Sequence, residues 1–191
     1  ADAMKTSKAD KAVCLMDIPD DWMQEANLDL YMETFESAVR FQEAYPDTLW
    51  CYGNHDLSYE WGQQESGFSF LAIQTVNEGL KNLKKALPVE KQIAYIHRID
   101  SVLFLHGGLT DPFVKYYASD VDYDDVDAVI DKINSLGCDE MWDDASPIWF
   151  RPQLDIEMMY KQEELLQVVG HTPVEELQMD WNLISCDLFS T

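Results

Sequence analysis

Four short polar motifs hold the residues of this sequence whose types and spacing could do chemistry. In chain order they are MDIPDD at 16–21, GNHD at 53–56, HGGL at 106–109 and GHTP at 170–173. One carboxylate, one amide and two imidazoles in these motifs come from Asp17, Asn54, His106 and His171. A mixed set of oxygen and nitrogen donors suits Mn²⁺, Fe or Zn²⁺ better than Ca²⁺ or Mg²⁺, which prefer oxygen alone. One such motif is weak support, because a single histidine after a strand is more often structural, but four in order predict a metal site.

The hydrophobic pattern predicts an α/β fold that would bring these motifs together, because short β-rich runs alternate with helical spacing. The predicted strands are 11–16, 48–52, 92–96, 102–106, 166–170 and 182–186, and helical stripes run through 28–42, 70–87 and 126–133. Each motif follows a predicted strand, which is where open α/β sheets build their sites. HRID at 97–100 reads as a tight turn that makes 92–106 a hairpin.

Length and charge narrow the class of protein. A chain of 191 residues, 47% of them hydrophobic, is expected to form one domain over residues 1–191. The net charge of −23 disfavours nucleic acids and anionic membranes as partners. Four isolated cysteines fit a reducing compartment, and no apolar run approaches the roughly 20 residues that a membrane span needs. We therefore expect a cytoplasmic protein, and both ends of the domain look truncated.

The motifs and their order resemble the calcineurin-like metallophosphoesterase superfamily, and within it the bacterial type of the phosphoprotein phosphatase branch, which is serine/threonine phosphatase-like. That branch carries D-x-H, G-D-x-x-D-R-G, G-N-H-E/D, H-G-G-L and G-H, and residues 17–172 carry the last four in order. The resemblance implies an α/β fold of two mixed β-sheets packed as a sandwich and flanked by helices. It also implies two divalent metal ions at the strand ends, Mn²⁺ first and Fe or Zn²⁺ as alternatives.

The resemblance assigns a role to each motif residue. Asp17 would bridge the two metal ions, and the other three donors named above would complete the shell of the second ion. His55 would be the general acid that protonates the leaving oxygen, and Asp20 would hold it. A pair of metal ions lowers the pKa of a bridging water and clamps the phosphoryl oxygens for in-line attack. An imidazole beside a carboxylate can donate a proton at neutral pH.

Three departures from the family pattern stand out. No D-x-H precedes Asp17, and since that motif supplies the first metal's own ligands, we expect it roughly 25 to 30 residues upstream in the encoded protein. Met16 stands where the family has a glycine, and its side chain would crowd the turn. Two phosphate-binding arginines are replaced by Asp21 and Tyr52. Arg151 in SPIWFRP resembles a W-x-R-P segment of bacterial members, so we predict that it binds phosphate, with an ion pair to the acidic surface as the alternative.

The function that the resemblance implies is hydrolysis of phosphate monoesters by a metal-bridging hydroxide, as in a serine/threonine protein phosphatase-like enzyme. The substrate would be a phosphorylated protein or small molecule, and the sequence leaves the oligomeric state open. Two alternatives remain. One is a dinucleoside polyphosphate hydrolase, since the motifs are shared. The other is a catalytically dead binding module of the same fold, which the missing D-x-H would favour.

Overall fold

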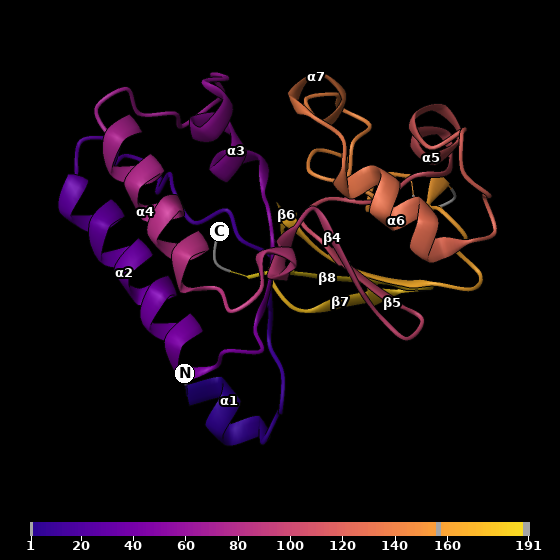
Figure 1. Ribbon diagram of the computed structural model, residues 1–191, viewed down its shortest axis with the longest axis horizontal. Helices are drawn as coiled ribbons and strands as arrows, with labels where there is room; N and C mark the ends of the chain where they lie inside the picture. Colours follow the sequence, from indigo (N-terminus) through magenta and orange to yellow (C-terminus); the bar gives the residue numbers. More distant parts are fainter. Residues whose placement is uncertain (1, 156–157, 189–191) are drawn as a thin grey trace. The chain divides into compact units, whose positions relative to one another are not determined.

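Helices form in this protein where apolar residues recur at helical spacing, and strands form where β-rich runs are short. The computed structural model describes residues 2–155 and 158–188 (Figure 1). Up to residue 94 the elements are α1 (Asp2–Ser7), β1 (Val13–Cys14), α2 (Leu28–Ala44), β2 (Leu49–Cys51), α3 (Asn54–Trp61), α4 (Ile73–Ala86), the 3₁₀ helix η1 (Glu90–Gln92) and β3 (Ile93–Ala94). From residue 96 onward they are β4 (Ile96–Ile99), β5 (Val102–Leu105), α5 (Asp111–Tyr117), α6 (Val126–Asn134), α7 (Cys138–Met141), β6 (Leu166–Pro173), β7 (Gln178–Asp180) and β8 (Leu183–Asp187).

The described chain divides into two compact units, one formed by residues up to 50 together with 54–93, the other by residues 51–53 together with those from 94 onward. The prediction of a single domain over residues 1–191 stays a prediction. Among the described residues, no helix is both long and apolar enough to cross a membrane.

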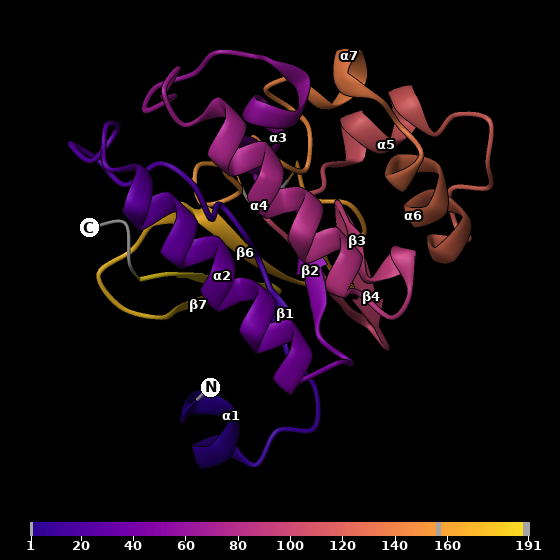
Figure 2. The same cartoon turned by 60° about the vertical axis from the view of Figure 1, so that its left-hand side comes forward.

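In the first unit, α2 and α4 lie side by side, as Figures 1 and 2 both show. The side chain of Asn27 caps α2 by accepting a hydrogen bond from the Leu30 backbone N–H. The helices approach closely at Gly79, where an added Cβ would lie only 2.3 Å from Cγ of Phe35. Phe35 is 2% exposed, so its ring fills the space that a side chain on α4 would otherwise occupy.

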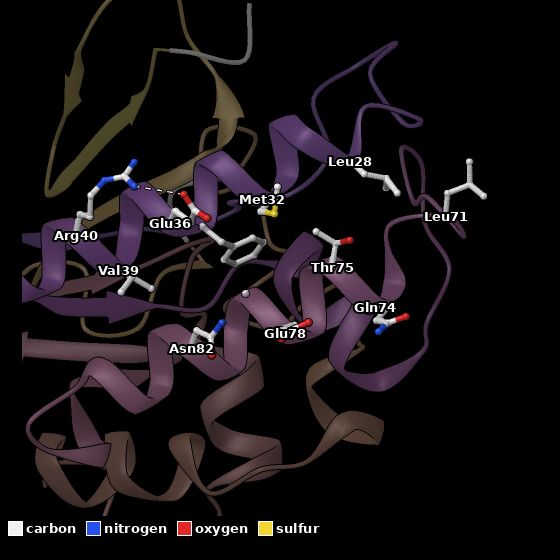
Figure 3. Close-up of a pocket in the computed structure, with 12 residues that line it drawn as sticks. Leu28, Met32, Glu36, Val39, Arg40, Leu71, Gln74, Thr75, Glu78 and Asn82 are labelled. Carbon is white, nitrogen blue, oxygen red and sulfur yellow. Dashed lines mark hydrogen bonds and ion pairs between the residues drawn. The ribbon is translucent and has the colours of Figure 1, made fainter.

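A groove of about 670 Å³ is lined by residues of α2 and α4 and by Leu71, which precedes α4 (Figure 3). Apolar side chains such as Leu28, Met32 and Leu71 line it together with polar ones such as Gln74 and Asn82. None of its lining residues belongs to the four polar motifs. The groove therefore lies apart from the residues that could do chemistry.

Two β-sheets flanked by helices confirm the predicted α/β fold. The first sheet has three strands in the order β1-β2-β3, and β1 pairs with β2 in parallel. The second has five strands in the order β4-β5-β6-β8-β7 and is mixed, because β5, β6 and β8 are parallel while β4 and β7 pair antiparallel at the two edges. All six predicted strand segments contain strand residues.

Two of the predicted local structures are wrong. HRID is not a turn, because β4 continues to Ile99, which pairs with Val102 across a two-residue connection. That tight connection is possible because Asp100 adopts a left-handed backbone conformation with φ 55°. GHTP does not follow its strand but lies inside β6, where the register with β8 shifts between Val169 and Pro173. Such a bulge redirects a side chain without ending the strand.

Candidate active site

Parallel pairing of β1 with β2 brings MDIPDD and GNHD to the same edge of the first sheet. Val13 pairs with Leu49, so the chain leaves both strands in the same direction. Asp17 comes shortly after β1, and Asn54 is the first residue of α3, which begins shortly after β2. The expectation that these motifs follow strands is confirmed.

The loop after β1 has a strained backbone at the residues of interest. Met16, Asp17 and Asp20 have φ of 28°, 62° and 73°, in a region that side chains other than glycine rarely adopt. The position where the family has glycine thus takes the conformation that glycine favours, and here methionine adopts it. Such strain costs of order 1–3 kcal/mol for each residue, and it persists only where surrounding contacts impose it.

Asp56, the last residue of GNHD, supplies contacts of this kind. Its side chain is fully buried, and its two carboxylate oxygens accept hydrogen bonds from the backbone N–H groups of Asp17 (2.8 Å) and Ile18 (3.1 Å). In return, the Asp17 carboxylate accepts a hydrogen bond of 3.0 Å from the backbone N–H of His55, in the first turn of α3. The two motifs are therefore joined by hydrogen bonds in both directions.

His55 and Asp20 form the pair that the sequence predicted. Nδ1 of His55 lies 3.0 Å from Oδ2 of Asp20, and the Asp20 side chain is only 1% exposed. His55 retains 17% exposure. With Nδ1 turned to Asp20, the other ring nitrogen, Nε2, is the one left to exchange a proton with a substrate.

Two tyrosines fix the other oxygen of Asp20. The hydroxyl of Tyr31 on α2 donates to Asp20 Oδ1 at 2.9 Å, and the hydroxyl of Tyr59 on α3 donates to the same oxygen. Tyr59 in turn accepts a hydrogen bond from the Ser69 backbone N–H at 2.8 Å. Burial, helped by the bond to Asp20, raises the pKa of Tyr31 to about 12, so this tyrosine stays a proton donor.

The sequence analysis missed these tyrosines as parts of the site. Tyr31 falls within the helical stripe of 28–42 and is buried, as a core-facing residue would be, and Tyr59 belongs to none of the four motifs. No signal in the sequence pairs either of them with Asp20.

The charges around His55 favour its protonated form. Burial is the largest single effect and would lower the pKa of His55. The hydrogen bond to Asp20 and the negative charges of Asp17, Glu65 and Asp20 together outweigh burial and raise this pKa to about 9. A group acting as a general acid must be protonated at neutral pH, and His55 meets this condition.

Glu65 is a further residue of this cluster that the sequence analysis missed. Its carboxylate Oε2 accepts a hydrogen bond of 2.6 Å from Nδ2 of Asn54, and its Oε1 lies 3.5 Å from Nδ1 of His55. Burial raises the pKa of Glu65 to about 7, although the charge of His55 and the bond from Asn54 oppose the rise. A single glutamate in the polar stretch GQQESG gave no pattern that could have revealed it.

In the second unit, His106 and His171 come together. His106 directly follows β5, His171 lies in β6, and these two strands are parallel neighbours. Nε2 of His106 lies 3.1 Å from Nδ1 of His171, and the residues are 2% and 8% exposed. His171 also has a left-handed backbone, with φ 60°. Two buried imidazoles with ring nitrogens this close can bind the same ion.

The HGGL motif is held in place by its neighbours. The buried side chain of Gln167 both accepts from the Leu109 N–H and donates to the Leu109 carbonyl, each at 2.9 Å. A Cβ on Gly107 would lie 2.8 Å from the carbonyl oxygen of Phe150. The two glycines of this motif therefore allow the chain to approach segment 147–152 closely.

Arg151 belongs to that same segment and reaches His171. Its Nη1 donates to the His171 carbonyl at 3.0 Å and to Oγ1 of Thr172 at 3.3 Å. The ring of Trp149 meets the His171 ring edge to face, with centroids 5.7 Å apart. Arg40 and Arg98 instead make exposed contacts, with Glu36 and Asp127 respectively. Arg151 is thus the arginine that contacts a motif residue.

Each unit therefore assembles the predicted residues that belong to it. The first gathers Asp17, Asp20, Asn54 and His55, and the second gathers the two histidines of HGGL and GHTP with the arginine beside them. The donor set of carboxylate, amide and imidazole groups fits a divalent transition metal. Which residues bind metal stays a prediction.

A model of the calcineurin-like phosphoesterase family matches residues 2–187. No match was found among curated proteins. Among solved structures, the chain is similar to a cold-active protein-tyrosine phosphatase of a psychrophile, Shewanella sp., with 17% identity and a TM-score of 0.59 over 94% of this chain and 60% of that one. It is also similar to a second structure of a cold-active protein tyrosine phosphatase, with 17% identity and a TM-score of 0.57 over 94% and 59% of the two chains.

The chain spans about 60% of the length of these solved relatives. At such identity their likeness shows the fold, and it agrees with the match to the family model over nearly the whole chain. The order of the four motifs, the two sheets and the family match lead to one conclusion: this chain belongs to the calcineurin-like phosphoesterase family.

Proposed function

We propose that this protein is a metal-dependent phosphatase that hydrolyses phosphate monoesters. The observation that carries the proposal is the pair formed by His55 and Asp20, with a 3.0 Å contact, next to Asn54 and hydrogen-bonded to Asp17 through the His55 backbone. Such a pair places a proton donor one residue along the chain from Asn54, the proposed oxygen ligand, and a general acid beside a metal suits the hydrolysis of phosphate esters. Family membership supports the reaction class.

Two divalent metal ions are the proposed cofactors, with Mn²⁺ first and Fe or Zn²⁺ as alternatives. Asp17, Asn54, His106 and His171 are the residues proposed to hold metal, and the order of their motifs, which matches the order in this family, supports the proposal. Bound ions of this kind lower the pKa of water and neutralise charge on the phosphoryl oxygens.

Side chains of this protein would donate the proton and bind the phosphoryl group. His55 donates a proton from Nε2 to the departing oxygen, while Asp20 and the two tyrosines on it keep the ring oriented. Arg151 would bind a phosphoryl oxygen with the part of its guanidinium that does not contact His171. The contacts of His55 in the first unit support its role, and the contacts of Arg151 in the second unit support its own.

The proposed substrate class rests on the solved relatives and on the motif pattern. The solved relatives are described as protein tyrosine phosphatases, and the motif pattern resembles serine/threonine phosphatases, so a phosphoprotein is the substrate that we propose. The sequence supports a cytoplasmic location. A dinucleoside polyphosphate hydrolase and a catalytically dead binding module are the alternatives that the following experiment separates.

The test uses the full-length protein, stripped with a chelator and then reloaded with Mn²⁺, Zn²⁺, Fe²⁺ or Ca²⁺ in turn. Phosphate release is measured from p-nitrophenyl phosphate, from phosphoserine and phosphotyrosine peptides, and from diadenosine tetraphosphate. We expect activity on monoesters that is lost on chelation and restored best by Mn²⁺. Activity confined to diadenosine tetraphosphate, or none with any metal, would contradict the proposal.

Metal analysis of two variants tests the ligands directly. His106→Ala and His171→Ala should each lower the metal content per chain, because each removes an imidazole from the metal set. His97→Gln is the matched control, since His97 is a histidine of β4 outside the motifs. Metal content equal to that of the control in both variants would show that these histidines are not ligands.

A further inference from the structure

We propose that Glu65 is a positioning residue that sets the orientation of the Asn54 side chain toward a bound divalent metal ion. The inference rests on the proposed function, because it assigns Asn54 as a metal ligand. It adds a residue that lies outside every motif of the sequence and that no family pattern described above contains.

The first step is the chemistry of the amide. An asparagine side chain has one end that donates, Nδ2, and one end that accepts, Oδ1, and only the oxygen can bind a metal ion. An ionised carboxylate only accepts hydrogen bonds. With Oε2 of Glu65 2.6 Å from Nδ2, the amide end of Asn54 faces Glu65. The oxygen Oδ1 is thereby turned away from Glu65, as its proposed role as a metal ligand requires.

The second step is where Glu65 lies. Its side chain is 6% exposed, so a carboxylate has been removed from water at a considerable cost in free energy. Burial of this kind is retained where the charge has specific partners. The partners here are Asn54 and, at 3.5 Å, Nδ1 of His55. One carboxylate therefore contacts both functional residues of the GNHD motif.

The third step is the loop that carries Glu65 between α3 and α4. Gly62 and Gly67 on either side of it have φ of 66° and 89°, so the chain turns sharply both before and after Glu65. At Gly67, an added Cβ would lie 3.5 Å from Cβ of Asp20 and 3.6 Å from Cε1 of His55. The loop thus packs directly on the His55 and Asp20 side chains, with Glu65 pointing to Asn54.

The competing interpretation is that Glu65 only anchors its own loop. Both interpretations predict some loss of stability when the side chain is removed. They differ in metal binding, because only a residue that orients Asn54 acts on the affinity for metal through Asn54. Outer-shell partners of metal ligands typically change metal affinity about 10- to 100-fold when they are removed.

The experiment measures Mn²⁺ binding to the metal-free, full-length protein by isothermal titration calorimetry, with thermal unfolding recorded for each variant. Glu65→Ala should weaken Mn²⁺ binding by roughly 10- to 100-fold. Glu65→Gln should fall between wild type and Glu65→Ala, because a glutamine can turn either its oxygen or its amide to Asn54. The matched control is Glu60→Gln on α3, where Glu60 is exposed and pairs with Lys84, and its Mn²⁺ affinity should equal that of the wild type.

A double-mutant cycle with Asn54→Ala separates the two interpretations. If Glu65 acts through Asn54, adding Glu65→Ala to Asn54→Ala should leave Mn²⁺ affinity unchanged. Additive losses, or wild-type affinity in Glu65→Ala, would overturn the positioning role while leaving the proposed function intact. A wild-type protein that binds no divalent ion would overturn both.

Discussion

The loss of activity that we predict for His55→Ala depends on the substrate. If Nε2 of His55 protonates the departing oxygen, the loss must be large for a serine alkoxide, which leaves poorly without a proton. It must be small for p-nitrophenolate, which is stable as an anion. General acid catalysis typically contributes about 10²- to 10⁴-fold, or about 2.7–5.5 kcal/mol in the activation free energy. We expect His55→Ala to lower kcat by that factor on a phosphoserine peptide and by far less on p-nitrophenyl phosphate.

Asp20→Asn should lower the activity less than His55→Ala does, and the contacts of Asp20 determine by how much. Asp20 accepts from His55, Tyr31 and Tyr59, so Asp20→Asn can keep the tyrosine bonds through its remaining oxygen. Its amide would face Nδ1 of His55 and would replace a charge-assisted hydrogen bond of about 1.5–3 kcal/mol. We therefore expect a loss of about 10- to 100-fold on the phosphoserine peptide, less than in His55→Ala.

Both variants are assayed with Mn²⁺ at saturation, and metal content is measured alongside. It should match the wild type in His55→Ala, since Asn54 and not His55 is assigned to the metal. Equal losses on the two substrates, or loss of metal from His55→Ala, would refute the reasoning and make His55 a ligand or a structural residue.

Three further predictions concern stability and substrate binding. Replacing glycine by alanine usually stabilises a helix by about 0.5–1 kcal/mol. Gly79→Ala should instead lower the free energy of unfolding by about 1–3 kcal/mol, because the new Cβ would lie 2.3 Å from the Phe35 ring. Urea denaturation measures this free energy, and an increase would contradict the prediction. Asp56→Ala leaves two backbone N–H groups of the loop after β1 without their acceptor, so unfolding in urea should show a loss of about 2–6 kcal/mol, and a loss under 1 kcal/mol would argue against this bracing role. Arg151→Lys should raise KM for p-nitrophenyl phosphate about tenfold at nearly constant kcat, because lysine cannot bind phosphate with two parallel bonds; an unchanged KM would leave Arg151 with only its contact to β6.

Much of the fold could be predicted from local pattern. The helical stripes located α2, α4 and α6, since amphipathic spacing is a property of neighbouring residues. The short β-rich runs located six strand segments for the same reason. Errors fell where a single backbone conformation decided the outcome. Because Asp100 is left-handed, the hairpin turn lies after Ile99 and not at 97–100 as predicted. Because β6 continues through a bulge, His171 lies within a strand and not after it.

Asp17, Asn54, His55, His106 and His171 could be proposed as site residues from the sequence because their types and order form a pattern along the chain. Such motifs can be recognised in a sequence because sites in α/β sheets form where strands end. The side chains of the site therefore occur in short stretches that follow β-rich runs. The sequence by itself thus determined the family and the candidate residues.

Only the tertiary structure decided which side chains support them. Tyr31, Tyr59 and Glu65 come from two helices and a loop, at positions that no spacing rule connects to Asp20 or Asn54. Hydrogen bonds between distant segments are sensitive to differences of a few tenths of an ångström in the distance between donor and acceptor, and these distances arise from the packing of whole helices and loops. A linear pattern contains the identities of the residues but not those distances.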